Sequence, residues 1–165
     1  MQPGDIGFAH TKGILGRLIR LGEWLKGRGS EWNHCFVIDR ITEEGAYIIQ
    51  ATLRGVTDSA LLSDVAPGGT YITFSPPCDR EKLLEFAKAQ VGARYSFLTI
   101  LSIAIDIVSW NWVPSLMNSY RQSWVCSGLL CEGMRYGGWL HEWVNIYTVT
   151  PQQAYDALVA VSIQD

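Results

Sequence analysis

Residues 33–39 read NHCFVID, and this stretch decides the interpretation of the fold. Most of its residues favour β-strands, and it contains neither Gly nor Pro, so it predicts a strand. Side chains of a strand alternate between the two faces of a sheet, so His34 points away from the face that receives Cys35. We expect His34 to face a groove while Cys35 packs inside the protein.

Three further strands are expected around this one. They are residues 5–9 (DIGFA), 46–51 (AYIIQA) and 70–75 (TYITFS). Pro76 ends the last of them, because proline has no amide hydrogen with which to continue a ladder. Residues 57–64 lie between the last two strands, and they are expected to hold a short helical turn.

Apolar residues at helical spacing predict helices in the rest of the chain. The expected helices are residues 13–26, 79–91, 124–136 and 151–159. Asp79 is the expected N-cap of the second helix, and Gly92 is its stop signal. Strands gather in the first half and helices in the second, which indicates an α+β fold with residues 1–165 as one domain.

One apolar segment, residues 97–113 (FLTILSIAIDIVSWNWV), invites comparison with a membrane span. It lies at the short end of the range for spanning helices, and Asp106 interrupts it. We interpret it as a buried or groove-lining helix, with membrane contact as the alternative. Residues 1–5 lack the basic start and apolar core of a secretory signal, so the chain is expected to be cytoplasmic as synthesised.

The charge and the cysteine content of the chain limit the classes of function that it can have. The formal net charge is 13 − 16 = −3, and no long run of Lys or Arg exists, so a nucleic-acid partner is not indicated. The four cysteines are Cys35, Cys78, Cys126 and Cys131. A chain of this length and apolar content does not need disulfides for stability, and we expect reduced thiols.

Cys126 is the candidate nucleophile. It opens a predicted helix, where the helix dipole and unpaired backbone N–H groups favour a thiolate and a developing oxyanion. Gly128 lets a substrate chain approach closely. The alternative is a buried structural thiol, which is the commonest fate of a free cysteine.

Cysteine chemistry also needs a base and a group that orients it. His34 is the candidate base, and Gln50, a polar residue in an otherwise apolar strand, is placed to reach its far ring nitrogen. His10 and His141 are weaker alternatives for the base. No Cys/His pairs have the spacing of a structural zinc site, so neither a metal nor another cofactor is expected.

Four segments resemble motifs of the NlpC-type cell-wall peptidases. Residues 124–130 (WVCSGLL) resemble the nucleophile motif, in which Cys-Ser-Gly-Leu opens the catalytic helix. Residues 92–95 (GARY) resemble the Gly-x-x-Tyr segment of that family. Residues 4–6 (GDI) resemble its Gly-Asp-hydrophobic strand, and residues 33–37 (NHCFV) resemble its His-x-x-hydrophobic strand.

The order of these motifs resembles the circularly permuted branch, in which the cysteine comes last. This branch includes YiiX-like bacterial proteins and the lecithin:retinol acyltransferase-like group. In YiiX-like proteins the strand after the histidine carries a hydrophobic-Glu-Ala pattern, and Gln50 stands here in place of the acidic residue. A neutral amide can orient a histidine, but it stabilises imidazolium less than a carboxylate does.

The resemblance implies a papain-like, NlpC-type domain in permuted order, with a small antiparallel sheet or half-barrel packed against helices. It implies a Cys-His-Gln peptidase or amidase with Cys126, His34 and Gln50 as catalytic residues. By the same resemblance, Tyr95 and Ser127 contact the substrate or the oxyanion. The implied substrate is a peptide bond of peptidoglycan, next to D-glutamate or diaminopimelate.

A phage or prophage origin agrees with this resemblance and with the missing secretory signal. The protein would then degrade the cell wall as a tail or lysis component of the virion. Two other functions stay open. One is a lipid-directed acyltransferase or thioesterase, with residues 97–113 as a lipid-facing wall in peripheral membrane contact. The other is a catalytically weak wall-binding module, for which Gln50 is the main argument.

Overall fold

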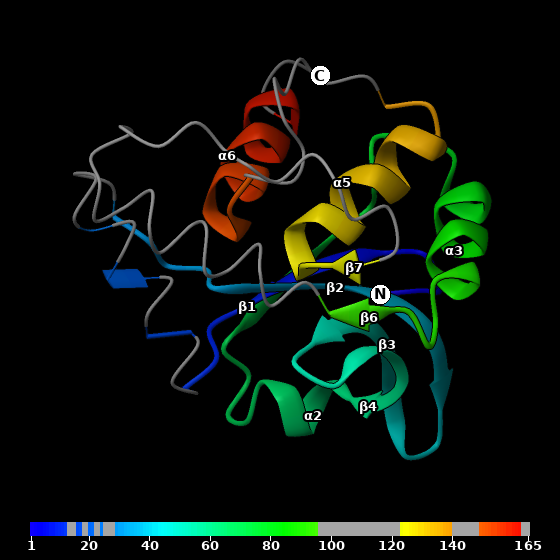
Figure 1. Ribbon diagram of the computed structural model, residues 1–165, viewed down its shortest axis with the longest axis horizontal. Coiled ribbons are helices and arrows are strands. Elements are labelled where there is room, and N and C mark those ends of the chain that lie inside the picture. Colours follow the sequence, from blue (N-terminus) through cyan, green and yellow to red (C-terminus); the bar gives the residue numbers. More distant parts are fainter. Residues whose placement is uncertain are drawn as a thin grey trace.

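The computed structural model describes residues 1–12, 16–17, 20–21, 24, 29–95, 123–139 and 149–162. These residues form an α+β arrangement around an antiparallel five-stranded sheet (Figure 1). The strands lie in the order β4-β3-β2-β1-β5. Their bounds are β1 (Ile6–Ala9), β2 (His34–Thr42), β3 (Gly45–Thr52), β4 (Gly55–Leu61) and β5 (Tyr71–Phe74).

Helices cover both faces of this sheet. In Figure 1, α3 (Arg80–Ala89), α5 (Cys126–Tyr136) and α6 (Pro151–Ser162) lie on one side, and the short α2 (Leu62–Val65) lies on the other. The alternation of β2 explains the two layers. Cys35 and Val37 belong to the core beneath α5, whereas Phe36 and Ile38 belong to the core beside α2.

Local signals set the ends of α3 and α5. The carboxylate of Asp79 accepts hydrogen bonds from the backbone N–H groups of Glu81 and Lys82, both at 3.1 Å, and so caps α3. Helix α5 starts at Cys126 and ends at Tyr136, directly before Gly137. Both predicted helices are present, but α3 ends two residues before the predicted end at 91, and α5 begins two residues after the predicted start at 124. Helix α6 begins at the predicted Pro151.

The sequence interpretation of residues 57–64 was wrong in part. Residues 55–61 form strand β4, which pairs with β3, and the helical turn begins only at Leu62. Strand β4 is an edge strand with several polar residues, so its sequence lacks the apolar alternation that identifies a half-buried strand. The four predicted strands appear as β1, β2, β3 and β5.

A short parallel pair that the sequence did not predict leads into α5. Strand β6 (Arg94–Tyr95) pairs with β7 (Ser123–Trp124), and Tyr95 is the partner of Trp124. The segment 97–113 and His141 lie outside the described residues, as does most of the predicted helix 13–26. Residues 16, 17, 20, 21 and 24 of that helix are described, and they are helical.

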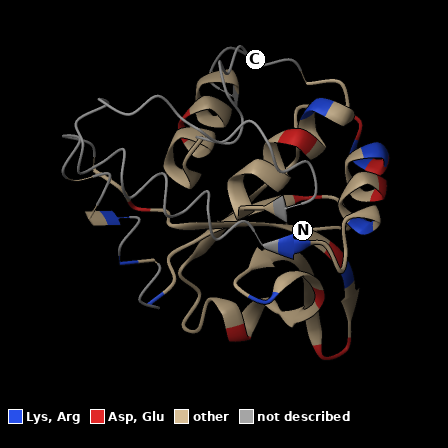
Figure 2. Cartoon of the chain, viewed as in Figure 1, with Lys and Arg blue, Asp and Glu red and all other residues tan. Residues whose placement is uncertain are grey.

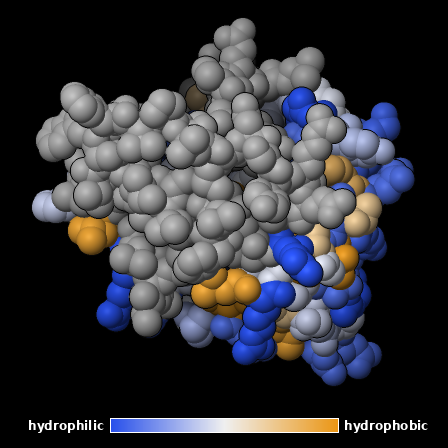
Figure 3. Space-filling model, viewed as in Figure 1, coloured by the Kyte–Doolittle hydropathy of each residue, from blue (hydrophilic) through white to orange (hydrophobic). Residues whose placement is uncertain are grey.

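None of the helices in the described part of the chain combines the length and the apolar character needed to cross a membrane. Figure 3 shows that apolar residues on the described part of the visible face stand among hydrophilic ones. Large apolar side chains with high exposure, such as Trp24 (69%) and Leu53 (61%), come from separate parts of the chain. Such isolated exposure is normal for a globular protein.

Candidate active site

Cys126 is the first residue of α5, at the end of the helix that faces the sheet. Its N-cap, Val125, has an extended backbone and provides no side-chain hydrogen bond to the helix. The first N–H groups of a helix have no acceptor within it, so those around Cys126 are available to an anion beside its sulfur. The side chain itself is only 6% exposed.

His34 opens β2 and meets Gln50 from the neighbouring strand. The register pairs Val37 with Ile49, which turns Gln50 to the same face of the sheet as His34. The Nε2 atom of His34 lies 2.7 Å from Oε1 of Gln50. With the amide oxygen as acceptor, Nε2 carries a hydrogen and Nδ1 is left to accept a proton.

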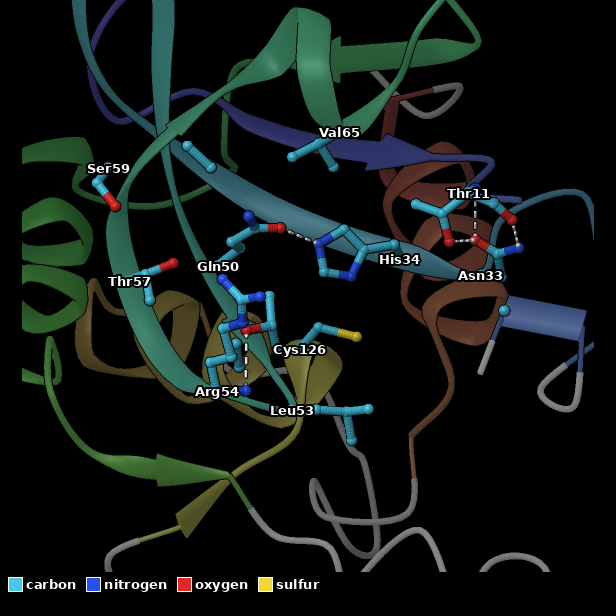
Figure 4. A pocket seen from close by; sticks show the side chains of 14 residues that line it. Thr11, Asn33, His34, Gln50, Leu53, Arg54, Thr57, Ser59, Val65 and Cys126 are labelled. Carbon is cyan, nitrogen blue, oxygen red and sulfur yellow. Dashed lines mark hydrogen bonds between the residues drawn. The ribbon is translucent and has the colours of Figure 1, made fainter. Parts of the chain in front are cut away.

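Figure 4 shows how the three side chains converge. Gln50 points at one nitrogen of the His34 ring, and the Cys126 sulfur lies on the side of the other nitrogen. The imidazole therefore stands between the thiol and the amide. This is the arrangement in which a histidine can take a thiol proton at one nitrogen while the other is held in place.

The environment of His34 favours its protonated form. Burial by itself lowers the pKa of His34, but the hydrogen bond and the charge of Cys126 raise it, as does the hydrogen bond with Gln50. These contacts outweigh burial, and the pKa of His34 lies above its ordinary value.

The environment of Cys126 favours its thiolate. The largest influence on the pKa of Cys126 is a hydrogen bond from Cys35, which lowers it, and burial opposes this effect. The hydrogen bond and the positive charge of His34 lower the pKa again, so that it falls well below its ordinary value. The two shifts act in the same direction, because each favours a thiolate–imidazolium pair over a neutral thiol and a neutral imidazole.

Cys35 is a residue of the site whose contribution sequence reasoning did not identify. It is 1% exposed and packs on the same face of β2 that receives α5. Burial and the neighbouring Cys126 raise the pKa of Cys35 well above its ordinary value. Cys35 therefore stays a thiol and can donate its hydrogen to the sulfur of Cys126. The alternation of 33–39 predicted its burial, but not this contact.

The pair opens onto a pocket of about 510 Å³. It is lined by residues from the start of β2, from β3 and β4, and from the turn between these two strands (Figure 4). The lining residues are Thr11, Gly16, Asn33, His34, Gln50, Ala51, Thr52, Leu53, Arg54, Thr57, Ser59, Ala60, Val65 and Cys126. This volume is in the range of pockets that hold small molecules or a few residues of a peptide.

Asn33 fixes the wall of the pocket beside His34. Its side-chain oxygen accepts hydrogen bonds from the backbone N–H and the hydroxyl of Thr11, at 2.8 and 2.9 Å. Its Nδ2 atom donates to the carbonyl of Thr11 at 2.9 Å. Asn33 is 1% exposed, and sequence reasoning did not single it out. The sequence signal that could have identified Asn33 is its position as a polar residue directly before His34, the candidate base.

His10 is engaged elsewhere. Its Nδ1 atom lies 3.0 Å from the carbonyl oxygen of Glu31, and its Nε2 atom contacts Arg20. It is not among the residues that line the pocket. The geometry therefore favours His34 over His10 as the partner of Cys126, and His141 lies outside the described residues.

The Gly-Asp segment, residues 4–6, lies outside the pocket and joins β1 to α3. Asp5 is buried, and its Oδ1 atom lies 3.1 Å from Nη2 of Arg80, the first residue of α3. Gly4 has a φ of +83°, and a Cβ there would lie 2.1 Å from Cγ of Arg80. Glycine is therefore required at this position, and the role of the segment is structural.

Tyr95 and Ser127, the two residues expected to contact the substrate or the oxyanion, differ in their position relative to Cys126 and the pocket. The backbone of Tyr95 pairs beside Trp124, close to the start of α5. Ser127 is 3% exposed and does not line the pocket, so its side chain is not presented to a ligand there. The roles of both residues stay predictions.

Within the ranges that the structure describes, no three His, Cys, Asp or Glu residues gather closely enough to hold a metal ion. Cys35, Cys78, Cys126 and Cys131 are all free thiols. Cys126 is the one of these thiols that has the imidazole of His34 beside it.

No protein-family model matches the chain, and no curated protein has a significantly similar sequence.

Proposed function

We propose that this protein is a cysteine hydrolase in which Cys126 is the nucleophile and His34 the base. The observation that carries the proposal is the position of the His34 ring, which stands between the Cys126 sulfur and Oε1 of Gln50 at the wall of a pocket. A structural thiol needs neither a histidine beside it nor a depressed pKa. Both features are expected of a nucleophile.

The proposed reaction is cleavage of an amide through a thioester. The Cys126 thiolate attacks the carbonyl carbon, and backbone N–H groups at the start of α5 stabilise the oxyanion. As the C–N bond breaks, the imidazolium of His34 gives its proton to the leaving amine. Neutral His34 then takes a proton from water, which attacks the thioester and releases the acid. Cys126 leaves as a thiolate, and the proton stays on His34.

We propose a papain-like domain in permuted order as the fold of this enzyme. The helix that begins with the nucleophile packs on an antiparallel sheet that carries the base, and the nucleophile comes last in the chain. This arrangement agrees with the motif order described above. The same resemblance makes a peptide bond of peptidoglycan the proposed substrate, with delivery by a phage particle as the route to the wall.

Replacement of the nucleophile tests the proposal. Cys126→Ala is expected to abolish the release of new amino groups from purified muropeptides, because no thioester can form. The matched control is Cys78→Ala. Burial raises the pKa of Cys78 to about 11, so this thiol is not a nucleophile at neutral pH, and its loss should leave turnover unchanged.

Wild-type turnover in the Cys126→Ala variant would refute the proposal. A second outcome would redirect it. If the wild-type protein transfers acyl groups from lipid esters in a Cys126-dependent manner but leaves muropeptides intact, the site serves lipid-directed acyl transfer instead.

A further inference from the structure

We infer that Arg54 binds a carboxylate that the substrate carries close to its scissile carbonyl. The substrate is then an acidic acyl compound rather than a neutral one. This inference rests on the proposed function, because it assigns a ligand group to the pocket in which Cys126 reacts.

Arg54 stands at the mouth of this pocket on a fixed piece of backbone. It lies in the turn between β3 and β4, where its N–H donates to the hydroxyl of Thr52 at 3.2 Å. The next residue, Gly55, has a φ of +106°, and a Cβ there would lie 2.6 Å from the carbonyl oxygen of Ala93. The turn is therefore pressed against the segment before β6, and its position is set by the fold.

The side chain of Arg54 is turned toward the reacting groups. It lines the pocket together with Gln50 and Cys126, and Figure 4 shows its guanidinium group directed into the pocket rather than away from it. The residue is exposed, so the guanidinium group is open to a ligand that enters from solvent.

Arg54 lacks the carboxylate partner that several other arginines of the described residues have. Arg80 pairs with Asp5, and Arg135 pairs with Glu132. Among the described residues, no carboxylate lies within ion-pairing distance of Arg54, and neither Asp nor Glu lines the pocket. An anionic ligand would supply the missing partner.

The local charge of the pocket is opposite to that of the whole chain. The formal net charge is −3, yet the pocket presents Arg54, the imidazole of His34, whose pKa is raised by Cys126 and Gln50, and the N-terminus of α5. Figure 2 shows basic residues on the turn between β3 and β4 and on β6, which lie on the same side of the molecule. The attraction for an anion is therefore local.

The number of positively charged side chains in the pocket indicates which anionic group of a ligand fits there. One arginine lines the described pocket, and the charge that His34 carries when protonated is compensated by the Cys126 thiolate beside it. A single guanidinium group matches the one charge and the planar, two-oxygen geometry of a carboxylate. A phosphate monoester carries nearly two charges and would leave one of them uncompensated.

Alkylation of Cys126 by two small reagents tests the inference without a known substrate. Iodoacetate and iodoacetamide form the same new bond to sulfur and release the same iodide, but only iodoacetate carries a carboxylate. The quantity measured is the rate constant for iodoacetate divided by that for iodoacetamide, with modification of Cys126 followed by peptide mass analysis. Arg54→Ala is expected to lower this ratio by about fivefold, with the iodoacetamide rate changed less than about twofold.

Two further variants separate local charge from net charge. Arg54→Lys keeps the positive charge and should retain most of the ratio, although it loses the two-pronged contact. Arg135→Ala removes the same charge from the far end of α5, and it should leave the ratio unchanged. An unchanged ratio in Arg54→Ala, or an equal fall in Arg135→Ala, would overturn the inference.

The absolute rate reports on the proposed function separately. If Cys126 reacts with iodoacetamide no faster than a free thiol at neutral pH, the activated pair is refuted. The dependence of the ratio on Arg54 then still decides whether the pocket binds a carboxylate.

Discussion

Cys35, Cys126 and Cys131 illustrate at the residue scale how environment, rather than residue type, determines reactivity. All three are buried in the core beneath α5. Burial raises the pKa of Cys131 and of Cys35, and the neighbouring Cys126 raises both further. Only Cys126 has its pKa lowered, because it receives hydrogen bonds from Cys35 and from His34. Of the three thiols, Cys126 is the one whose surroundings favour the thiolate, and it is the nucleophile of the proposed mechanism.

Gln50 decides how strongly His34 holds its proton. In the proposed mechanism the reactive form has Cys126 ionised and His34 protonated, so the rate of hydrolysis rises as the thiol ionises and falls as the imidazolium loses its proton. The hydrogen bond from His34 to Gln50 raises the pKa of His34. Gln50→Ala should therefore move the alkaline limb of the pH–rate profile to lower pH. Gln50→Glu adds a carboxylate beside the imidazolium and should move this limb to higher pH by about one unit.

The profile is recorded from the hydrolysis of purified muropeptides, because the leaving amine of this reaction takes its proton from His34. The two Gln50 variants serve as controls for each other, since a nonspecific disturbance would shift both in the same direction. Alkaline limbs that coincide in all three proteins would show that Gln50 does not govern the ionisation of His34.

At the scale of elements, the site depends on how α5 and β2 are fixed relative to each other. Helix α5 packs on β2 and β3, and α3 packs on α5. Asp5 at the start of β1 forms an ion pair with Arg80 at the start of α3. The Gly-Asp segment thus links the middle of the sheet to the helical layer that supports α5.

Asp5→Ala is expected to destabilise the protein by about 2 kcal/mol, because it leaves Arg80 without its partner in a partly buried position. Urea unfolding followed by circular dichroism measures the loss. The matched control is Glu85→Ala, which removes one negative charge from an exposed position on the same helix. Equal stability of the two variants would show that the ion pair contributes nothing.

At the scale of the whole molecule, one core unites the sheet with α3, α5 and α6. Leu130 of α5 is 1% exposed within it, alongside Met134 at 0%. This core holds the N-terminus of α5 against the start of β2, where His34 lies. The core therefore determines the geometry of the candidate site as well as the stability of the protein.

Leu130→Ala should lower the free energy of unfolding by about 3 kcal/mol, because it leaves a cavity beneath α5. Ile41→Ala provides the comparison, since Ile41 is 49% exposed, and it should change stability by less than about 0.5 kcal/mol. Chemical denaturation of both variants gives the difference. A loss below about 1 kcal/mol for Leu130→Ala would contradict the packing described for α5.

The sequence by itself determined the features that depend on neighbouring residues. Alternation in 33–39 predicted the strand and the burial of Cys35, and Asp79 and Pro151 predicted where α3 and α6 begin. Cys126 was expected at the start of a helix, and it is there. These signals are local because capping, alternation and helical spacing act over a few residues.

Only the tertiary structure decided which residues that are distant in the sequence lie in contact. Strand β4 is stabilised by pairing with β3 rather than by its own apolar pattern, so the sequence did not reveal it. That hairpin carries Arg54 to the mouth of the pocket, and the sheet brings His34 to Gln50. The donor contact from Cys35 to Cys126 likewise depends on α5 packing against β2. Such contacts join residues far apart in the chain, and their energies appear only after the core has formed.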